Sequence, residues 1–215
     1  MPYRSPILET NEFYHIFNRS IAYEKIFKTM TYKNLFMNLI FYYNSRSILP
    51  HSFLKNLSNG SQNILDVIAR AESPGIEIVA YAIMPTHFHL ILKQTKDGEI
   101  SRYLRRLEVS YAKSYNCMKV RHGGVFSGRF GSVKIKSQNQ LHVAARYIFL
   151  NPIKAKIITI KELDDYPYTS YHCLGEAHPH VKSEYILEGF EDVYEFSQYV
   201  KSGYIERPEY LPEEM

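Results

Sequence analysis

The hydrophobic positions of the chain follow a strand period in some segments and a helix period in others. Residues Phe13–Arg19 alternate side chains and carry several aromatics, which predicts a first strand. A helix is expected from an N-cap at Thr31 to about Tyr43, because apolar residues recur there at helical spacing. Residues 45–60 lose this periodicity and gain Ser, Asn, Pro and Gly, which predicts a loop before a short helix over 63–71.

The middle of the chain predicts a hairpin followed by a long helix. Two strand-like runs, Ile76–Met84 and His87–Lys93, are separated only by Pro85 and Thr86, so we expect them to pair as an antiparallel hairpin. A turn then leads into a helix over Glu99–Met118 that has an apolar stripe along one side.

The next segment predicts a last strand and a helix. Val125–Lys136 is expected to form a strand or an extended loop. Ser137, with Gln140 three residues later, has the form of a capping box, so a helix is expected to begin there. Pro152 is expected to end this helix because it disfavours helical geometry at Asn151.

This order of elements predicts an α+β fold. We expect a ferredoxin-like, RRM-like antiparallel sheet with helices packed on one face, and an open face that can accept a single nucleic-acid strand. A main domain is expected over residues 1–160. An acidic C-terminal extension over 161–215 is expected to be partly helical, over Tyr185–Phe190 and Tyr194–Val200.

Composition narrows the class of protein. The 215 residues are 45% hydrophobic and 22% charged, as in an ordinary folded domain. The sequence has no leader-like start and no apolar run of membrane-spanning length, so we expect neither secretion nor a membrane partner. Cys117 and Cys173 lack metal-ligand spacing and are interpreted as reduced thiols, which favours a cytoplasmic location.

Charge is segregated along the chain. The net charge is +4, but residues 93–161 carry +12 and residues 162–215 carry −10. A basic block of this size is typical of proteins that bind a phosphate backbone, and a solvated basic surface is the alternative. The acidic segment either offsets repulsion within the protein or competes with nucleic acid for the basic surface.

Two residue pairs suggest site chemistry. His87 and His89 lie two apart in a strand, so they point the same way about 6.6 Å apart and could bind one metal ion. Alone, such a pair is more often structural. Tyr147 and Asn151 lie four apart in the predicted helix and therefore share one face. A histidine pair, a tyrosine and an amide around a metal would suit phosphoryl chemistry with a tyrosine nucleophile.

Two segments resemble motifs of the HUH single-tyrosine transposases, an insertion-sequence type of transposase. Tyr81–Leu90 (YAIMPTHFHL) resembles the HUH motif, in which two histidines flank a hydrophobic residue. Arg146–Ala155 (RYIFLNPIKA) resembles the nucleophile helix of the REP-associated tyrosine transposases. Three further segments resemble the family more loosely and follow its order along the chain, at residues 14–19, 124–130 and 166–171.

The resemblance implies a DNA strand transferase that cleaves and rejoins single-stranded DNA through a 5′-phosphotyrosine, at sites flanked by hairpins. It assigns Tyr147 as the nucleophile and His87 and His89 as ligands of Mg²⁺ or Mn²⁺. Asn151 is implied as a third ligand, with a helix C-cap as its alternative role. Residues 46–74 are then an insertion, since this link is usually shorter in the family.

Contacts to DNA are expected from the basic block. Arg146 lies beside the nucleophile and is expected to contact either the scissile phosphate or a structural acid. His15 has no spacing that singles it out and is interpreted as structural or surface. Tyr14, Phe17 and Phe130 are candidates for base stacking, with the core as the favoured alternative. The full set of predicted phosphate-binding residues is Arg102, Arg105, Arg106, Arg129, Lys134, Lys136 and Arg146.

Two other classes of function stay open. One is a non-catalytic module of the same fold that binds hairpin DNA or RNA. The other is a metal-dependent phosphodiesterase that activates water instead of Tyr147. Single-stranded or hairpin DNA is the expected partner, and the protein is expected to act as a monomer or homodimer.

Overall fold

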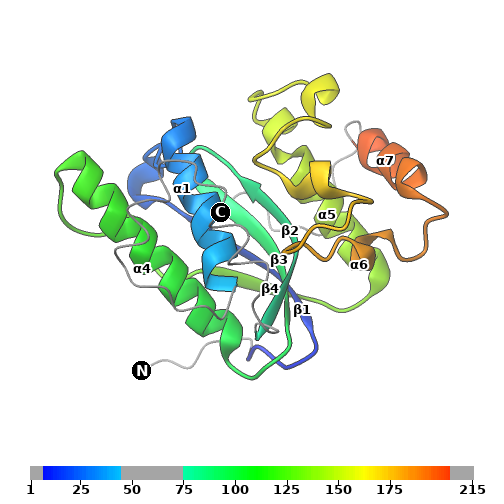
Figure 1. Ribbon diagram of the computed structural model, residues 1–215, viewed down its shortest axis with the longest axis horizontal. Coiled ribbons are helices and arrows are strands. Elements are labelled where there is room, and N and C mark those ends of the chain that lie inside the picture. The colour runs from blue at the N-terminus through cyan, green and yellow to red at the C-terminus, as the bar shows by residue number, and fades with distance from the viewer. Residues whose placement is uncertain (1–6, 45–74, 204–215) are drawn as a thin grey trace.

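The computed structural model of the protein describes residues 7–44 and 75–203 (Figure 1). The expected insertion at 46–74 and the short helix predicted over 63–71 lie outside these ranges. The strands and long helices are β1 Phe13–Arg19, α1 Met30–Asn44, β2 Ile76–Ile83, β3 His87–Gln94, α4 Glu99–Lys119, β4 Gly131–Ile135 and α5 Gln138–Lys154. The shorter elements are η1 Ile21–Tyr23, η3 Ile160–Glu162, η4 Ser170–Cys173, α6 Glu184–Leu187 and α7 Val193–Ser202.

The four strands form one antiparallel sheet in the order β2-β3-β1-β4. This order, with the chain running β1-α1-β2-β3-α4-β4, is that of a ferredoxin-like sheet and confirms the predicted α+β class. The predicted hairpin is present as β2 and β3. In the β1–β3 pair, Phe17 lies opposite His89 and Arg19 lies opposite His87.

One face of the sheet carries the larger core. The aromatic rings of Phe36 on α1, Phe88 on β3 and Tyr111 on α4 pack together, with ring centroids 4.9 Å apart for the first two. The apolar stripes predicted for α1 and α4 point into this core. Figure 1 shows α1 and α4 lying side by side over this face of the sheet.

The opposite face is covered in part, which corrects the expectation that all helices pack on one face. α5 packs against the β2–β3 half, where Ala80 and Ala82 on the sheet meet Ala144 and Ala145 on the helix. These short side chains let the helix and the sheet approach closely. The β1–β4 half stays more open, and Val133 on β4 is 37% exposed.

Helix α5 begins as predicted but ends later. The Ser137 hydroxyl accepts a hydrogen bond from the Gln140 amide at 3.2 Å, as an N-cap should. Pro152 lies inside the helix, which continues to Lys154, so the prediction that it ends the helix is wrong. The C-cap is Ala155 rather than Asn151, because the amides after Pro152 still find helical carbonyls.

The start of α1 also differs from the prediction. The helix begins at Met30, and the Thr29 hydroxyl accepts a hydrogen bond from the Tyr32 amide at 3.4 Å. Thr29 therefore takes the capping role expected of Thr31, since both residues have the side chain that a cap needs.

The C-terminal segment packs on α5 and on the edge of the sheet. Ile186 of α6 and Phe196 of α7 join the apolar cluster on the outer side of α5. Thr169 bridges Ala82, and Val181 bridges Ile78, so two stretches of this segment cover the edge strand β2. The boundary at residue 160 between main domain and extension stays a prediction. No helix in the described ranges has the length and apolarity needed to cross a bilayer.

We expect Phe88→Ala to lower the free energy of unfolding by about 3–5 kcal/mol, because it empties a fully buried ring position. Urea denaturation of the purified protein measures this change. Val133→Ala, at a partly exposed position of β4, is the matched control and should cost about 0.5 kcal/mol or less. Equal losses for both variants would contradict this account of the core.

Candidate active site

The site is built on the face of β3 that looks toward α5. Side chains alternate along the strand, so His87 and His89 share this face while Phe88 between them lies in the opposite core. The two imidazole ring centroids are 5.0 Å apart, with the rings nearly perpendicular. His89 is buried and His87 is partly exposed, so this His pair lies at the border between the core and solvent.

A third imidazole completes the site. His15 on β1 is buried, and its Nε2 lies 2.9 Å from Nδ1 of His89, within hydrogen-bond distance. The rings are stacked with centroids 5.1 Å apart. The interpretation of His15 as structural or surface therefore missed its contact with His89. The alternation of side chains around His15 predicts a strand. The contact between His15 and His89 also requires that β1 pairs with β3.

Helix α5 brings Tyr147 to these histidines. The Tyr147 ring centroid lies 5.6 Å from that of His89 and 6.1 Å from that of His15, edge-on in both cases. Nζ of Lys154 lies 5.4 Å from the centre of the Tyr147 ring. The residues predicted as nucleophile and metal ligands therefore come from two distant parts of the sequence to one place.

The free nitrogen atoms of the His pair fit a metal ion. Nδ1 of His87 lies 2.9 Å from the Thr86 hydroxyl, and Nδ1 of His89 faces His15. Both Nδ1 atoms thus have a neighbour of the kind that orients a metal-binding imidazole, which leaves Nε2 as the atom that would bind a metal. Nε2 of His89 is buried and has no hydrogen-bond partner among the described residues.

Asn151 is buried one turn after Tyr147 on α5, and its Nδ2 has no partner in the described structure. Within the described ranges, no three His, Cys, Asp or Glu side chains are placed to hold a metal. Any coordination by the His pair therefore needs other donors, such as an amide or water oxygen, which suit Mg²⁺ and Mn²⁺.

Burial keeps the imidazoles neutral. Loss of hydration lowers the pKa of both His15 and His87 to about 4. Burial also holds the pKa of His89 well below its usual value, and the neighbouring His15 and His87 lower it further. At neutral pH the three rings are therefore uncharged, which is the form that ligates metals.

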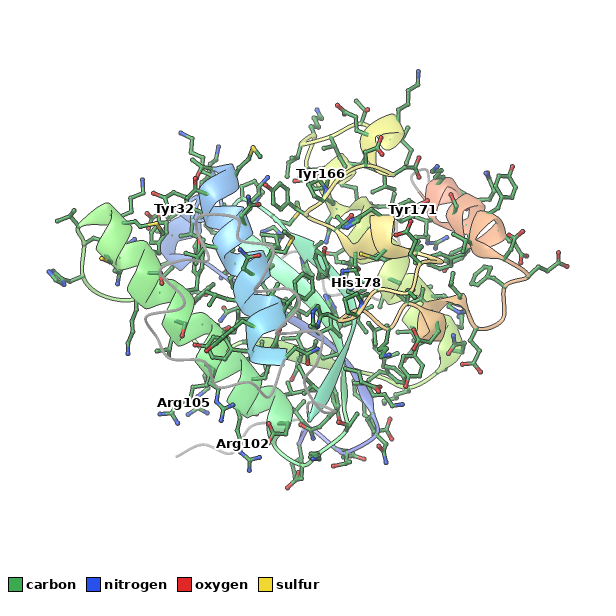
Figure 2. The ribbon with its side chains drawn as sticks, viewed as in Figure 1. Tyr32, Arg102, Arg105, Tyr166, Tyr171 and His178 are labelled. Carbon is green, nitrogen blue, oxygen red and sulfur yellow. The ribbon has the colours of Figure 1, made fainter. Side chains whose placement is uncertain are left out.

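The predicted arginines of α4 lie away from this site. Arg102, Arg105 and Arg106 are exposed on a helix that packs against the opposite face of the sheet. Figure 2 shows Arg102 and Arg105 on the side of α4 that points away from α5. Arg102 forms an ion pair with Glu99 at 2.5 Å. The structure therefore does not bring these three arginines to the His pair.

The remaining predicted contacts are distributed around the sheet. Lys134 on β4 forms ion pairs with Glu9 and Glu12 at 3.0 and 3.3 Å. Arg129 and Lys136 are exposed on either side of β4. Arg129 follows a loop that is hydrogen-bonded to the end of β1, where Ser127 donates its amide hydrogen to the carbonyl of Arg19.

Arg146 precedes the candidate nucleophile and is covered by the C-terminal segment. Its guanidinium carbon lies 4.4 Å from the ring centre of Tyr199 on α7. Gly203 lies so close that an added Cβ would stand 2.4 Å from Cδ of Arg146. This arrangement links α5 to α7, and neither of these two partners is the structural acid that is one of the expected contacts of Arg146.

The aromatic candidates for base stacking separate into two groups. Tyr14 is fully buried and Phe130 packs against the larger core, as the favoured alternative predicted. Phe17 is partly exposed on the face of the His pair, with its ring centroid 6.3 Å from that of His89. An added Cβ on Gly131 would meet the Phe17 ring at 2.1 Å, so this glycine leaves the space that the ring occupies.

The sequence matches a known family. A family model described as "Transposase IS200 like" matches residues 31–151. This match covers more than half of the chain, so the chain belongs to the IS200-like transposase family. The matched region contains the His pair, Tyr147 and Asn151, and begins after His15.

Two individual proteins agree with this assignment. A protein of Haemophilus influenzae named "Putative REP-associated tyrosine transposase" is 26% identical over 106 residues, which are 45% of this chain and 59% of that protein. The chain thus matches less than two thirds of that relative's length. A REP-associated tyrosine transposase solved bound to a REP hairpin is similar in structure, with a TM-score of 0.54 and 15% identity over 80% of this chain and 84% of that one. The first match confirms the resemblance to the REP-associated tyrosine transposases, and the second shows a shared fold.

In the presence of a chelator, we expect the free energy of unfolding to fall as the pH is lowered from about 6.5 toward 4. An unfolded histidine takes up a proton near pH 6.5, but folded His15 does so only near pH 4. The unfolded chain then binds more protons in this window, so stability rises with pH. His15→Gln should reduce the slope of the free energy of unfolding against pH by an amount equal to the uptake of at most one proton. Urea denaturation at several pH values measures this slope. Identical slopes would contradict the burial of a neutral His15.

Proposed function

We propose that the chain is a metal-dependent single-stranded DNA transesterase that cleaves and rejoins DNA through a 5′-phosphotyrosine, acting as a transposase at hairpin-flanked sites. One observation carries this proposal: in a chain of the IS200-like transposase family, the ring centroid of Tyr147 lies 5.6 Å from that of His89. A nucleophile beside a pair of neutral imidazoles is the arrangement that this chemistry requires.

The reaction conserves the energy of the phosphodiester. The phenolate oxygen of Tyr147 forms a bond to the scissile phosphorus, and the bond from phosphorus to the 3′ oxygen breaks. The 3′ oxygen takes up a proton and leaves as a hydroxyl. The 3′-hydroxyl of another DNA end can reverse these steps and release Tyr147, so strands are joined without ATP.

The histidine residues prepare the site. A divalent cation bound by His87, His89 and Asn151 would polarise the scissile phosphate and stabilise charge on its oxygen atoms. The hydrogen bond between His15 and His89 fixes the orientation of the His89 ring and keeps its Nε2 directed away from His15. The phenol of Tyr147 must lose its proton near neutral pH, although an unperturbed tyrosine has a pKa near 10.

Hairpin or single-stranded DNA is the proposed partner. The structural relative is bound to a REP hairpin, and a splayed single strand can present a phosphate to a tyrosine on a helix. The part of the β1–β4 half around Phe17 and Val133, which α5 covers less, offers a surface for such a strand next to the site. Arg129 and Lys136 at the ends of β4 are the predicted phosphate contacts that best fit this path.

A non-catalytic module that binds hairpin nucleic acid is the second candidate. The +12 charge of residues 93–161 supports binding without requiring cleavage, and the arginines on α4 lie far from the His pair. The covalent intermediate separates the two functions.

We expect Tyr147→Phe to abolish a covalent protein–DNA adduct and to reduce strand cleavage at least about 10³-fold, because the nucleophilic oxygen is lost. The measurement is a denaturing gel of labelled hairpin oligonucleotides incubated with Mn²⁺ or Mg²⁺. Tyr185→Phe is a matched control that should retain the adduct. Cleavage that survives Tyr147→Phe would indicate activated water instead, and binding without cleavage would favour the module.

We expect His15→Ala to weaken Mn²⁺ binding about 10- to 100-fold, as loss of a residue that orients a metal-ligating histidine does elsewhere. His87→Ala should weaken binding more, because it removes a ligand itself. Titration calorimetry or the paramagnetic resonance of free Mn²⁺ measures the affinity without DNA. His122→Ala, at an exposed loop position, is the control. Unchanged affinity in His87→Ala would contradict the metal site.

A further inference from the structure

We propose that Arg19 and Tyr23 form a nucleotide-binding subsite for single-stranded DNA beside the His pair, in which Arg19 binds a backbone phosphate and the Tyr23 ring stacks on a base. This inference rests on the proposed function and identifies how the strand is held next to the scissile phosphate. Neither residue is among those predicted to contact DNA.

The register of the sheet places Arg19 at the site. Arg19 on β1 lies directly opposite His87 on β3. Opposite residues of an antiparallel pair have Cβ atoms about 4.5–5.5 Å apart and point to the same face. The neighbouring Asn18 donates a hydrogen bond from Nδ2 to Glu108 on α4 at 2.9 Å, so it points to the other face. Alternation then directs Arg19 to the face of the His pair.

The side chains of Arg19 and Tyr23 form one unit. The Arg19 guanidinium donates a hydrogen bond to the Tyr23 hydroxyl at 2.7 Å, and its central carbon lies 4.9 Å from the ring centre. No carboxylate among the described residues pairs with Arg19. Most of its fork of donors therefore stays available for phosphate oxygens, which guanidinium groups bind in a bidentate way.

Tyr23 is presented to solvent rather than packed in a core. It is 62% exposed, and both Ala22 and Tyr23 have left-handed backbone conformations, with φ of 52° and 54°. This conformation is unfavourable for residues with a side chain and persists only where the surroundings impose it. Here the Ser20 hydroxyl donates to the Glu24 carbonyl at 2.6 Å, and the Glu24 carboxylate accepts from Tyr115 at 2.7 Å.

A strained turn that holds an exposed aromatic ring beside a guanidinium is suited to a single strand. Bases stack on aromatic rings with little sequence preference, and the adjacent charge follows the backbone. Two more exposed cations, Lys25 and Lys28, follow in the same segment. This segment runs along the turn that precedes His87, since the amide of Phe27 donates to the carbonyl of Pro85 at 3.0 Å.

The chain contains no tryptophan, which allows a direct test. In a Tyr147→Phe background, Tyr23→Trp introduces a single indole at the subsite, and Tyr194→Trp introduces one on the exposed surface of α7 as the control. The probe is a dT16 single strand. We expect dT16 to quench the emission of the Tyr23→Trp protein, because a base stacks on the ring, and to leave the emission of the control protein unchanged.

Affinity and its salt dependence test the two residues separately. In the same background, Tyr23→Ala should weaken binding of fluorescein-labelled dT16 about 10-fold, and Tyr23→Phe, which keeps the ring, much less. Arg19→Gln should reduce the slope of log affinity against log salt by about 0.7, the value for one phosphate contact on a single strand. Lys161→Gln, at an exposed position of the short helix η3, is the control for charge. Circular dichroism melting checks that each variant is folded.

Two results would overturn the subsite. One is the absence of dT16 binding by the Tyr147→Phe protein, and the other is binding with unchanged emission of the Tyr23→Trp protein and an unchanged slope in Arg19→Gln. These measurements require no cleavage, so they test binding at the subsite independently of the proposed transesterase activity. A covalent adduct with wild-type Tyr147 and no effect at Arg19 and Tyr23 would keep the proposed function and reject the subsite.

Discussion

The alternation of side chains along β3 is the constraint on which the rest of the structure depends. Phe88 fills the core beneath α1 and α4, while His87 and His89 on either side of it face α5. A shift of one residue in the pairing of β3 would bury both imidazoles in the larger core and expose the phenyl ring. The same packing that stabilises the sheet therefore sets the face of the sheet to which the His pair points.

The sequence was sufficient to predict features that depend on local order. The β2–β3 hairpin follows from two residues between two strands, and the shared face of His87 and His89 follows from their spacing. Features that depend on which strands and helices meet were missed. The contact of His15 with His89 requires β1 to pair with β3, and the position of α5 on the second face requires the short side chains of Ala80 and Ala82 to accept it. The prediction for Pro152 was wrong because the tendency of proline to end a helix is weaker than the packing that holds α5 on both sides.

Charge along the sequence and charge around the site differ for a physical reason. The basic block from 93 to 161 includes α4, which packs on one face of the sheet, and α5, which packs on the other. Its side chains therefore point in opposite directions and cannot form one groove. Under the proposed function, arginines on α4 would act on DNA through the long-range field of the protein or through a more distant part of the strand. The neutral imidazoles contribute no charge to this field at neutral pH.

The packing of the C-terminal segment has a consequence for how the chain can be divided. Residues 161–203 cover the outer side of α5 and the edge of β2, so the helix that carries Tyr147 is an interior layer of the molecule. A protein shortened to residue 160 would present Ile148, Phe149 and an open strand edge to water, and such surfaces favour aggregation. An acidic segment that resembles an appendage by its charge thus encloses the helix that carries Tyr147, and the two pack around one apolar cluster.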